Sequence, residues 1–284
     1  MGGHKLFYRC LNQASPTVIV EAGLNEPGAT SGTWDQVIEG VAASTRICVY
    51  DRANLGRSGA APKPRTSQDI ADDLHTLLDE AHIGGPYILV GHSIGGLHVR
   101  LYASRYPQDV AGMVLVDSSH PDQFARWLDR LPPASPNEGE RLKWLREYLN
   151  VQKEPAQNRE GLDIEASSAQ VRALGSLGEL PLVVLTRSPR ANPLGLPPEL
   201  NATVEGVWLE LQNELVGLSS NSTHRVAARA GHNIQRDEPQ AVVDAILKIV
   251  DEARAKRASM LHTAQGSRVA GFPMVYAGRP LSKQ

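Results

Sequence analysis

The sequence predicts an α/β protein in which a mostly parallel sheet carries helices on both faces. From residue 4 to about 120, short apolar and β-branched runs alternate with stretches of helical periodicity, as strands joined by crossover helices require. The runs are apolar at successive positions, which is typical of parallel strands buried on both faces. They lie at 17–21, 46–50, 87–90 and 112–116, and strand signals return at 182–185 and 223–228.

Helical periodicity between and after these runs supports the same fold class. Thr66 and Asp69, three residues apart, predict a capped helix start. Apolar residues then recur at helical spacing, at Ile70, Leu74, Leu77, Leu78 and Ala81. A last helix is predicted after Pro239, because proline is favoured in a first helical turn. Its apolar face carries Val242, Val243, Ile246, Ile249 and Val250.

The middle of the chain interrupts the alternation and predicts a small helical cap. Residues 121–180 contain no convincing strand run, and their aromatic and leucine side chains give them amphipathic helical character. We therefore expect residues 1–120 and 181–256 to form the α/β core, with the cap lying over the strand ends. Beyond residue 256 the pattern fades, so 257–284 is expected to be a loosely packed or disordered tail.

Composition excludes several classes of function. The chain has 284 residues, 41% of them hydrophobic, and a formal net charge of −2. A chain of this length can bury one sizeable hydrophobic core. The charge pattern gives no reason to expect nucleic acid as a partner. No apolar run approaches the roughly 18–20 residues of a membrane-spanning helix. Neither zinc-ligand spacing nor a phosphate-binding glycine loop is present, so we expect no metal and no cofactor.

The cysteines and the N-terminus bear on the compartment. The first residues are polar and do not have the pattern of a secretory signal. Cys10 and Cys48 lie in or beside strand-like segments, and we expect both to be buried free thiols. A cytoplasmic location is the resulting prediction.

Ser93 lies in a pentapeptide whose glycines fit a very sharp strand-to-helix turn. The segment Gly91-His92-Ser93-Ile94-Gly95 directly follows a strand run and precedes a helical stretch. Such a turn strains the serine backbone and exposes the hydroxyl above the sheet, and only small residues fit two positions before and after it. Ser93 is therefore the predicted nucleophile, and His92 is expected to point away from the site.

Attack of a serine on a carbonyl group also needs two backbone N–H groups aimed at the oxygen that becomes charged. Ile94, the residue after the nucleophile, is predicted to supply one of them. The other is expected from the glycine turn after the strand run at 17–21, where Gly23 precedes the predicted donor Leu24. Asn25, the next residue, is a predicted substrate contact.

Four segments resemble the α/β-hydrolase family of esterase and lipase type. They read EAGLNEPG, YDRANLGRS, LVGHSIGGLHVRLYASRYP and LVDSSHPD, beginning at residues 21, 50, 89 and 115. The resemblance covers about residues 4–122 and 181–255, and it implies an eight-stranded sheet, a triad in the order serine, acid, histidine, and no cofactor. It identifies no substrate, because the fold hosts many chemistries. Asp51 and Arg52 are expected to form an internal ion pair that shapes their loop.

His232 is the predicted general base. It lies between the last strand run and the last helix, in a loop that reaches the same carboxyl end of the sheet as Ser93. The family's catalytic histidine resembles it in position and in the preceding glycine, Gly231. We expect His232 to take the Ser93 proton and to return it to the leaving group.

The acid is missing from the place where the family usually has it. After 182–185 the sequence reads TRSPR, without a carboxylate. Asp117, at the end of the preceding strand run, is the predicted acid, and its segment VAGMVLVDSSHP resembles haloalkane dehalogenases, which carry their acid at that strand. Many hydrolases of this fold have a non-catalytic aspartate there, so Glu179 and Asp237 stay as alternatives.

A serine nucleophile excludes mechanisms that need an attacking carboxylate. It predicts acyl transfer, with carboxylic esters of small to medium size as the expected substrates. The alternatives are a lactone, amide or carbon–carbon bond as substrate, or a ligand-binding sensor on the same fold with little turnover. His120 and two cap residues, Trp127 and Trp144, are further predicted substrate contacts.

Overall fold

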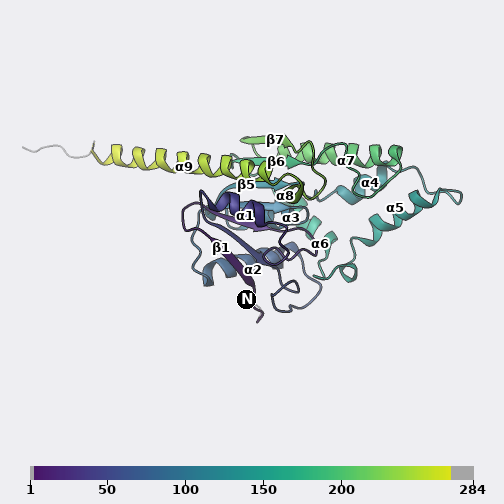
Figure 1. Cartoon of the computed structure of the whole chain (residues 1–284), viewed down its shortest axis with the longest axis horizontal. Coiled ribbons are helices and arrows are strands. Elements are labelled where there is room, and N and C mark those ends of the chain that lie inside the picture. The colour runs from purple at the N-terminus through teal and green to yellow at the C-terminus, as the bar shows by residue number, and fades with distance from the viewer. Residues whose placement is uncertain (1–2, 270–284) are drawn as a thin grey trace, which may run out of the picture.

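Within the residues that the structure describes, 3–269, a seven-stranded sheet forms the centre of the protein (Figure 1). The coordinates are a computed structural model. The strand order is β1-β3-β2-β4-β5-β6-β7, with β1 antiparallel to β3 and all other neighbours parallel. The strands are β1 (Phe7–Leu11), β2 (Thr17–Glu21), β3 (Ile47–Asp51), β4 (Tyr87–His92), β5 (Val110–Val116), β6 (Leu182–Thr186) and β7 (Ser222–Val226). The predicted α/β class is confirmed, and each predicted run overlaps one of β2–β7.

The expectation of eight strands is wrong for the described residues, which hold seven. The chain just before β1 bonds to a loop and adds no strand beside it. The Gly59 N–H donates to the Lys5 carbonyl at 2.8 Å, and the Phe7 N–H donates to Ser58 Oγ at 2.8 Å. The Ser58 hydroxyl also donates to the Asp51 carbonyl of β3, so this loop packs at the junction of β1 and β3, and β1 ends the strand order as the edge of the sheet.

Helices cover both faces of the sheet. One face packs against α1 (Asp35–Ala42), α8 (Ile234–Asp237) and the first part of α9 (Pro239–Val269). The other face packs against α2 (Ser67–Glu80), α3 (Gly95–Arg105) and α6 (Ile164–Arg172). The predicted capped start of α2 is confirmed, because the Thr66 N–H donates to the Asp69 carboxylate at 2.7 Å.

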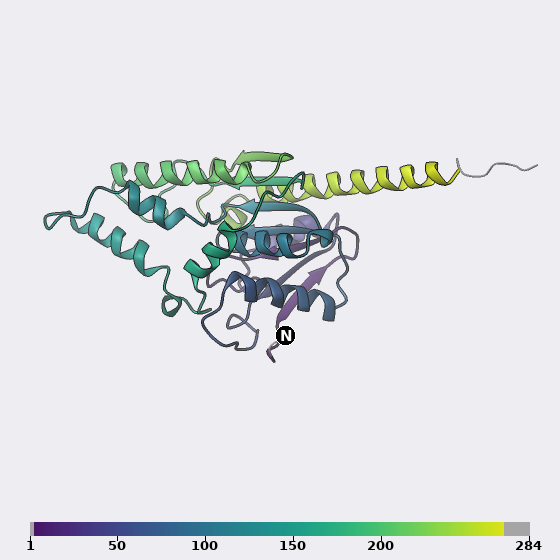
Figure 2. The same ribbon diagram turned by 180° about the vertical axis from the view of Figure 1, so that it is seen from behind.

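The remaining helices, α4 (Gln123–Arg130), α5 (Glu140–Val151) and α7 (Pro198–Val216), share a smaller apolar core made of Leu131, Leu145, Leu149, Leu196 and Val204. Figures 1 and 2 show them at the end of the molecule opposite the tip of α9. The cap boundaries at 121 and 180 stay a prediction, since α7 joins this core from outside that range.

Helix α9 is longer than its apolar face predicts. It continues through Val269, whereas the apolar periodicity fades near residue 256, and its second half extends away from the sheet (Figure 2). The rest of the predicted tail, 270–284, lies outside the described residues. No helix in the described part of the chain has the length and apolar character needed to cross a membrane.

Cys10 and Cys48 form a disulfide that joins β1 to β3, so the expectation of two free thiols is wrong. The two residues lie directly opposite each other in the antiparallel register. Their separation of 38 residues gave no sign of this contact. Only the pairing of β1 with β3 brings them together, and β1 was not among the predicted strand runs.

Candidate active site

Ser93 occupies the sharp turn between β4 and α3. Its φ is +52°, in the left-handed region that residues with a Cβ rarely adopt. A Cβ added to Gly91 would lie 2.8 Å from the Gly95 carbonyl oxygen, and one added to Gly95 would overlap the backbone of Glu21 and Ala22. The glycines two positions before and after Ser93 therefore let the turn pack against β2 and α3.

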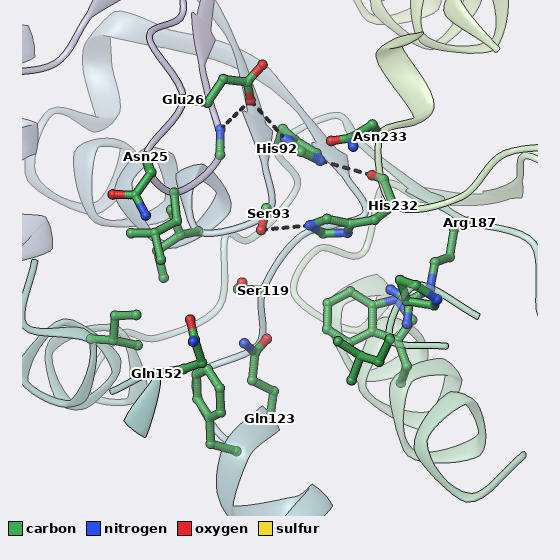
Figure 3. Close-up of a pocket in the computed structure, with 18 of the residues that line it drawn as sticks. Asn25, Glu26, His92, Ser93, Ser119, Gln123, Gln152, Arg187, His232 and Asn233 are labelled. Atoms are coloured by element: carbon green, nitrogen blue, oxygen red, sulfur yellow. Dashed lines mark hydrogen bonds and ion pairs between the residues drawn. The ribbon is translucent and has the colours of Figure 1, made fainter. Parts of the chain in front are cut away.

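Ser93, His232 and Asp117 form a continuous hydrogen-bonded chain. His232 Nε2 lies 3.0 Å from Ser93 Oγ, and His232 Nδ1 lies 2.6 Å from Asp117 Oδ2. They come from the ends of β4 and β5 and from the loop before α8, as Figure 3 shows for Ser93 and His232. The structure thus brings together the three residues that the sequence predicts for nucleophile, base and acid.

Asp117 is fully buried and receives hydrogen bonds from three side chains. Oδ2 accepts from Arg187 Nη1 at 2.8 Å as well as from His232, while Oδ1 accepts from Trp208 Nε1 at 2.9 Å and from the Arg187 N–H at 3.1 Å. Burial by itself would raise the pKa of Asp117. The charge of Arg187 and the His232 hydrogen bond outweigh burial and hold this pKa well below its usual range, so the carboxyl is ionised.

Arg187 is one of the residues that sequence reasoning missed at this site. It lies in the TRSPR segment, where the family usually has its acid, and its other edge pairs with Glu205 of α7, at 3.0 Å from Nε and 2.8 Å from Nη2. A buried arginine needs acceptors for its five N–H donors. The absence of a carboxylate from 186–190 was the only signal in the sequence.

The surroundings of His232 favour its neutral imidazole. Burial lowers its pKa, the Asp117 hydrogen bond and charge raise it, and the charges of His92 and Arg187 lower it, with a lowered pKa as the net result. Since Asp117 accepts from Nδ1–H, Nε2 is free to accept a proton from Ser93. This is the protonation state that a general base requires.

The turn after β2 has one N–H group without a partner. The Gly23 N–H donates to Glu26 at 3.1 Å and the Asn25 N–H donates to Glu160 at 2.6 Å. Among the described residues, the N–H groups of Leu24 and Ile94 have no acceptor. These are the two groups that the sequence predicts as oxyanion donors, and both residues border the cavity above Ser93.

Arg52 stabilises this turn through hydrogen bonds to its backbone carbonyls. Its Nη1 and Nη2 donate to the carbonyls of Ala22 and Gly23 at 2.7 and 2.6 Å, and its guanidinium pairs with Glu21 at 2.8 Å and Glu160 at 2.6 Å. All three charged side chains are buried.

The expected Asp51–Arg52 ion pair is therefore wrong. Asp51 is buried beside the loop N–H groups of Ala29 and Arg57, which donate to it at 2.8 and 3.0 Å. The physical reason is that Arg52 has two buried carboxylates within reach, one of them 108 residues away in the chain.

A cavity of about 610 Å³ opens above Ser93. One wall is apolar, with Phe124, Trp127, Leu194, Val204 and Trp208 among its residues. Polar side chains surround the rest, and Figure 3 shows Asn25, Gln123 and Gln152 around the space in front of Ser93. Of the predicted substrate contacts, Asn25 and Trp127 line the cavity, while Gln123, Gln152 and Trp208 were not predicted.

His120 and Trp144 do not line this cavity. The His120 ring lies between Asp122 and Glu214, at 3.8 and 3.5 Å, and burial lowers its pKa to about 4. Trp144 is 37% exposed and stacks on Tyr148, which itself reaches the cavity. The amphipathic pattern of the sequence indicated which face of this helix is apolar. It did not show that Tyr148, and not Trp144, reaches the cavity.

His92 does not point away from the site, contrary to expectation. Its Nε2 lies 3.0 Å from the His232 carbonyl, Glu26 lies 3.6 Å from its Nδ1, and its ring borders the cavity (Figure 3). It therefore supports the loop that carries His232. Of the alternative acids, Asp237 accepts the Gly231 N–H at 2.9 Å and Glu179 borders a different cavity.

The protein is thus an α/β protein in which a serine, a histidine and an aspartate are joined by hydrogen bonds at the carboxyl end of a mostly parallel sheet. The alpha/beta hydrolase fold family matches residues 16–159, just over half of the 284-residue chain, and the chain belongs to that family.

Individual relatives and structures agree with this membership. The uncharacterised protein YqjL of Bacillus subtilis is 29% identical over 233 residues, which is 82% of this chain and 83% of YqjL. An esterase from Thermogutta terrifontis superposes with a TM-score of 0.58 at 20% identity, covering 87% of this chain and 93% of the esterase. A loop variant of the haloalkane dehalogenase DbeA from Bradyrhizobium elkanii gives a TM-score of 0.65 at 17% identity, covering 91% and 96%. At these identities the two structures show the fold alone.

Proposed function

We propose that the protein is a serine hydrolase that cleaves carboxylic esters of small to medium size through an acyl-enzyme. The observation that carries this proposal is the hydrogen-bonded chain from Ser93 through His232 to Asp117, with distances of 3.0 and 2.6 Å. Ser93, at one end of this chain, lines the cavity together with Leu24 and Ile94, whose backbone N–H groups have no acceptor among the described residues. A nucleophile, a base and an oxyanion site in one place are the requirements of acyl transfer.

The reaction follows from these positions. Ser93 Oγ attacks the ester carbonyl carbon while His232 Nε2 takes its proton, and the carbonyl oxygen becomes an oxyanion that accepts hydrogen bonds from the Leu24 and Ile94 N–H groups. The imidazolium, stabilised by Asp117, gives the proton to the departing alkoxide, and the C–O bond breaks. A water molecule, deprotonated by His232, then attacks the carbonyl carbon of the acyl-enzyme. The bond between this carbon and Ser93 Oγ breaks, and His232 returns the proton to Oγ as the carboxylic acid leaves.

The cavity supports a substrate with one apolar part. Its volume of about 610 Å³ is within the ~300–1,000 Å³ of small-molecule sites. We expect the apolar wall near Trp127 and Trp208 to bind the hydrocarbon part of the ester. We expect the amides of Asn25, Gln123 and Gln152, which line the cavity, to bind its polar part.

An assay with p-nitrophenyl esters of increasing acyl length tests the proposal. We expect hydrolysis by the wild type and its loss in Ser93→Ala and in His232→Ala. Ser119→Ala is the matched control, because Ser119 lines the same cavity but takes no part in the hydrogen-bonded chain. Loss of activity in Ser119→Ala alone, with full activity in Ser93→Ala, would refute the proposal.

The sensor hypothesis has one observation in its favour. Arg187 shares Asp117 Oδ2 with His232 and so takes part of the negative charge that would stabilise the imidazolium. A wild type that hydrolyses no ester, lactone or amide, yet is thermally stabilised by such ligands, would favour a sensor.

The cytoplasmic location also stays a proposal. The Cys10–Cys48 disulfide weighs against it, because disulfides persist mainly in oxidising compartments.

A further inference from the structure

A second cavity lies between α3, the start of β5 and the segment after α6. Its volume is about 270 Å³, and it shares no residue with the cavity above Ser93. Arg100 lines it from α3, and Ser104, Gly175 and Ser176 also border it. The other lining residues are apolar: Ala103, Pro107, Val110, Leu174, Leu177, Leu180 and Leu218. A cavity of this composition with one arginine has the lining of a ligand site for an amphiphile.

Arg100 is a buried guanidinium without a protein partner. Its side chain belongs to a residue that is 5% exposed, its Nη1 is fully buried without an acceptor, and no hydrogen bond or ion pair joins it to any described residue. Burial lowers the pKa of Arg100 to about 10, an effect that the charge of Asp122 partly opposes, so the group is charged at neutral pH. Asp122 itself is bound by Arg172 at 2.5 Å.

The other buried arginines show how unusual this is. Arg52 pairs with two carboxylates, Arg187 pairs with two, and Arg65 pairs with Asp73. A buried charge is retained in proteins when a counter-charge and acceptors compensate its desolvation. At Arg100 no described residue accepts a hydrogen bond from the guanidinium, the charge of Asp122 acts on it without an ion pair, and Arg100 is the only charged residue among those that line the second cavity.

We propose that this cavity binds a small monocarboxylate, with Arg100 pairing with the carboxylate and the leucines covering a short hydrocarbon tail. The planar guanidinium presents paired donors that match the two oxygens of a carboxylate. One cation matches one negative charge. A dicarboxylate or a phosphate would leave additional charge against Leu174, Leu177 and Leu180, where no second cation lines the cavity.

Calorimetric titration of the whole chain with hexanoate tests the proposal. We expect one saturable hexanoate site in the wild type that is lost, or weakened at least tenfold, in Arg100→Met, and no such site for the neutral analogue hexanamide. Arg105→Met is the matched control, because Arg105 lies on the same helix, is exposed and does not line the cavity. In parallel, hexanoate should raise the Tm of the wild type and of Arg105→Met but not that of Arg100→Met.

The design separates this site from the cavity above Ser93. Hexanoate bound near Ser93 would be unaffected by Arg100→Met, so equal affinity in the wild type and in Arg100→Met overturns the proposal. Equal binding of hexanamide, or no saturable binding of hexanoate to the wild type, overturns it as well. Arg100→Lys keeps the charge but loses the paired donors, and its expected weaker binding provides the test if Arg100→Met does not fold.

Discussion

Replacing Arg187 with methionine tests how the proposed acid is tuned. Arg187 shares Asp117 Oδ2 with His232, and its positive charge lowers the pKa of His232. Activity requires neutral His232, so the rate rises as pH increases through this pKa. Without the guanidinium the imidazolium is less disfavoured, the pKa of His232 rises, and the acid limb of the kcat/KM profile moves to higher pH.

The same substitution has a stability cost that the structure allows us to gauge. Two unit charges about 4 Å apart interact by about 4 kcal/mol at an effective dielectric of ~20. Removal of one partner from a buried pair typically costs about 3–5 kcal/mol. Arg187→Met leaves both Asp117 and Glu205 buried without their common cation, so we expect a loss in this range, measured by urea unfolding.

Glu205→Gln should shift the pKa of His232 in the opposite direction from Arg187→Met. It leaves the charge of Arg187 less compensated, so the acid limb should move to lower pH. The measurement is kcat/KM for a p-nitrophenyl ester as a function of pH in the two variants and the wild type. An acid limb that stays in place in Arg187→Met, or that moves in the same direction in both variants, would refute the account of Arg187.

Three further outcomes follow from named contacts. Asp117→Asn should lower kcat by on the order of 10⁴ at saturating ester, because the imidazolium loses its orienting acceptor; near-native kcat would exclude Asp117 as the acid. Glu160→Gln should lower kcat about tenfold to a hundredfold by displacing the turn that carries an oxyanion donor, while Glu165→Gln, at an exposed position nearby, should leave kcat unchanged. The double substitution Cys10→Ser and Cys48→Ser should reduce the free energy of unfolding by about 4 kcal/mol for a loop of 38 residues, and an unchanged urea midpoint would contradict this.

The parts of the fold that could be predicted from sequence are those with local causes. The buried parallel strands β2–β6 are apolar at successive positions, and all five were predicted in this way, while the outer strand β7 was predicted from the weaker strand signal at 223–228. The turn at Ser93 is determined by the glycines around it, so the position of the serine above the sheet also follows from a short segment. Edge strand β1 contains no fully buried residue and has no such apolar run.

The parts that could not be predicted depend on partners far apart in the chain. Arg187 reaches Asp117 across 70 residues and Arg52 reaches Glu160 across 108. In both cases the partner of a buried charge is selected by how the helices and loops pack, which periodicity does not encode. The same holds for Cys10 and Cys48, whose contact exists only because β1 pairs with β3.

Covalent labelling of Ser93 tests the central proposal most directly. The protein would be treated with a fluorophosphonate, digested, and mapped by peptide mass. We expect a single adduct on Ser93, no adduct in Ser93→Ala, and strongly slowed labelling in His232→Ala, because His232 Nε2 lies 3.0 Å from the attacking oxygen. An unlabelled wild type, or an adduct on Ser119 with Ser93 unmodified, would contradict the proposal that Ser93 is the nucleophile.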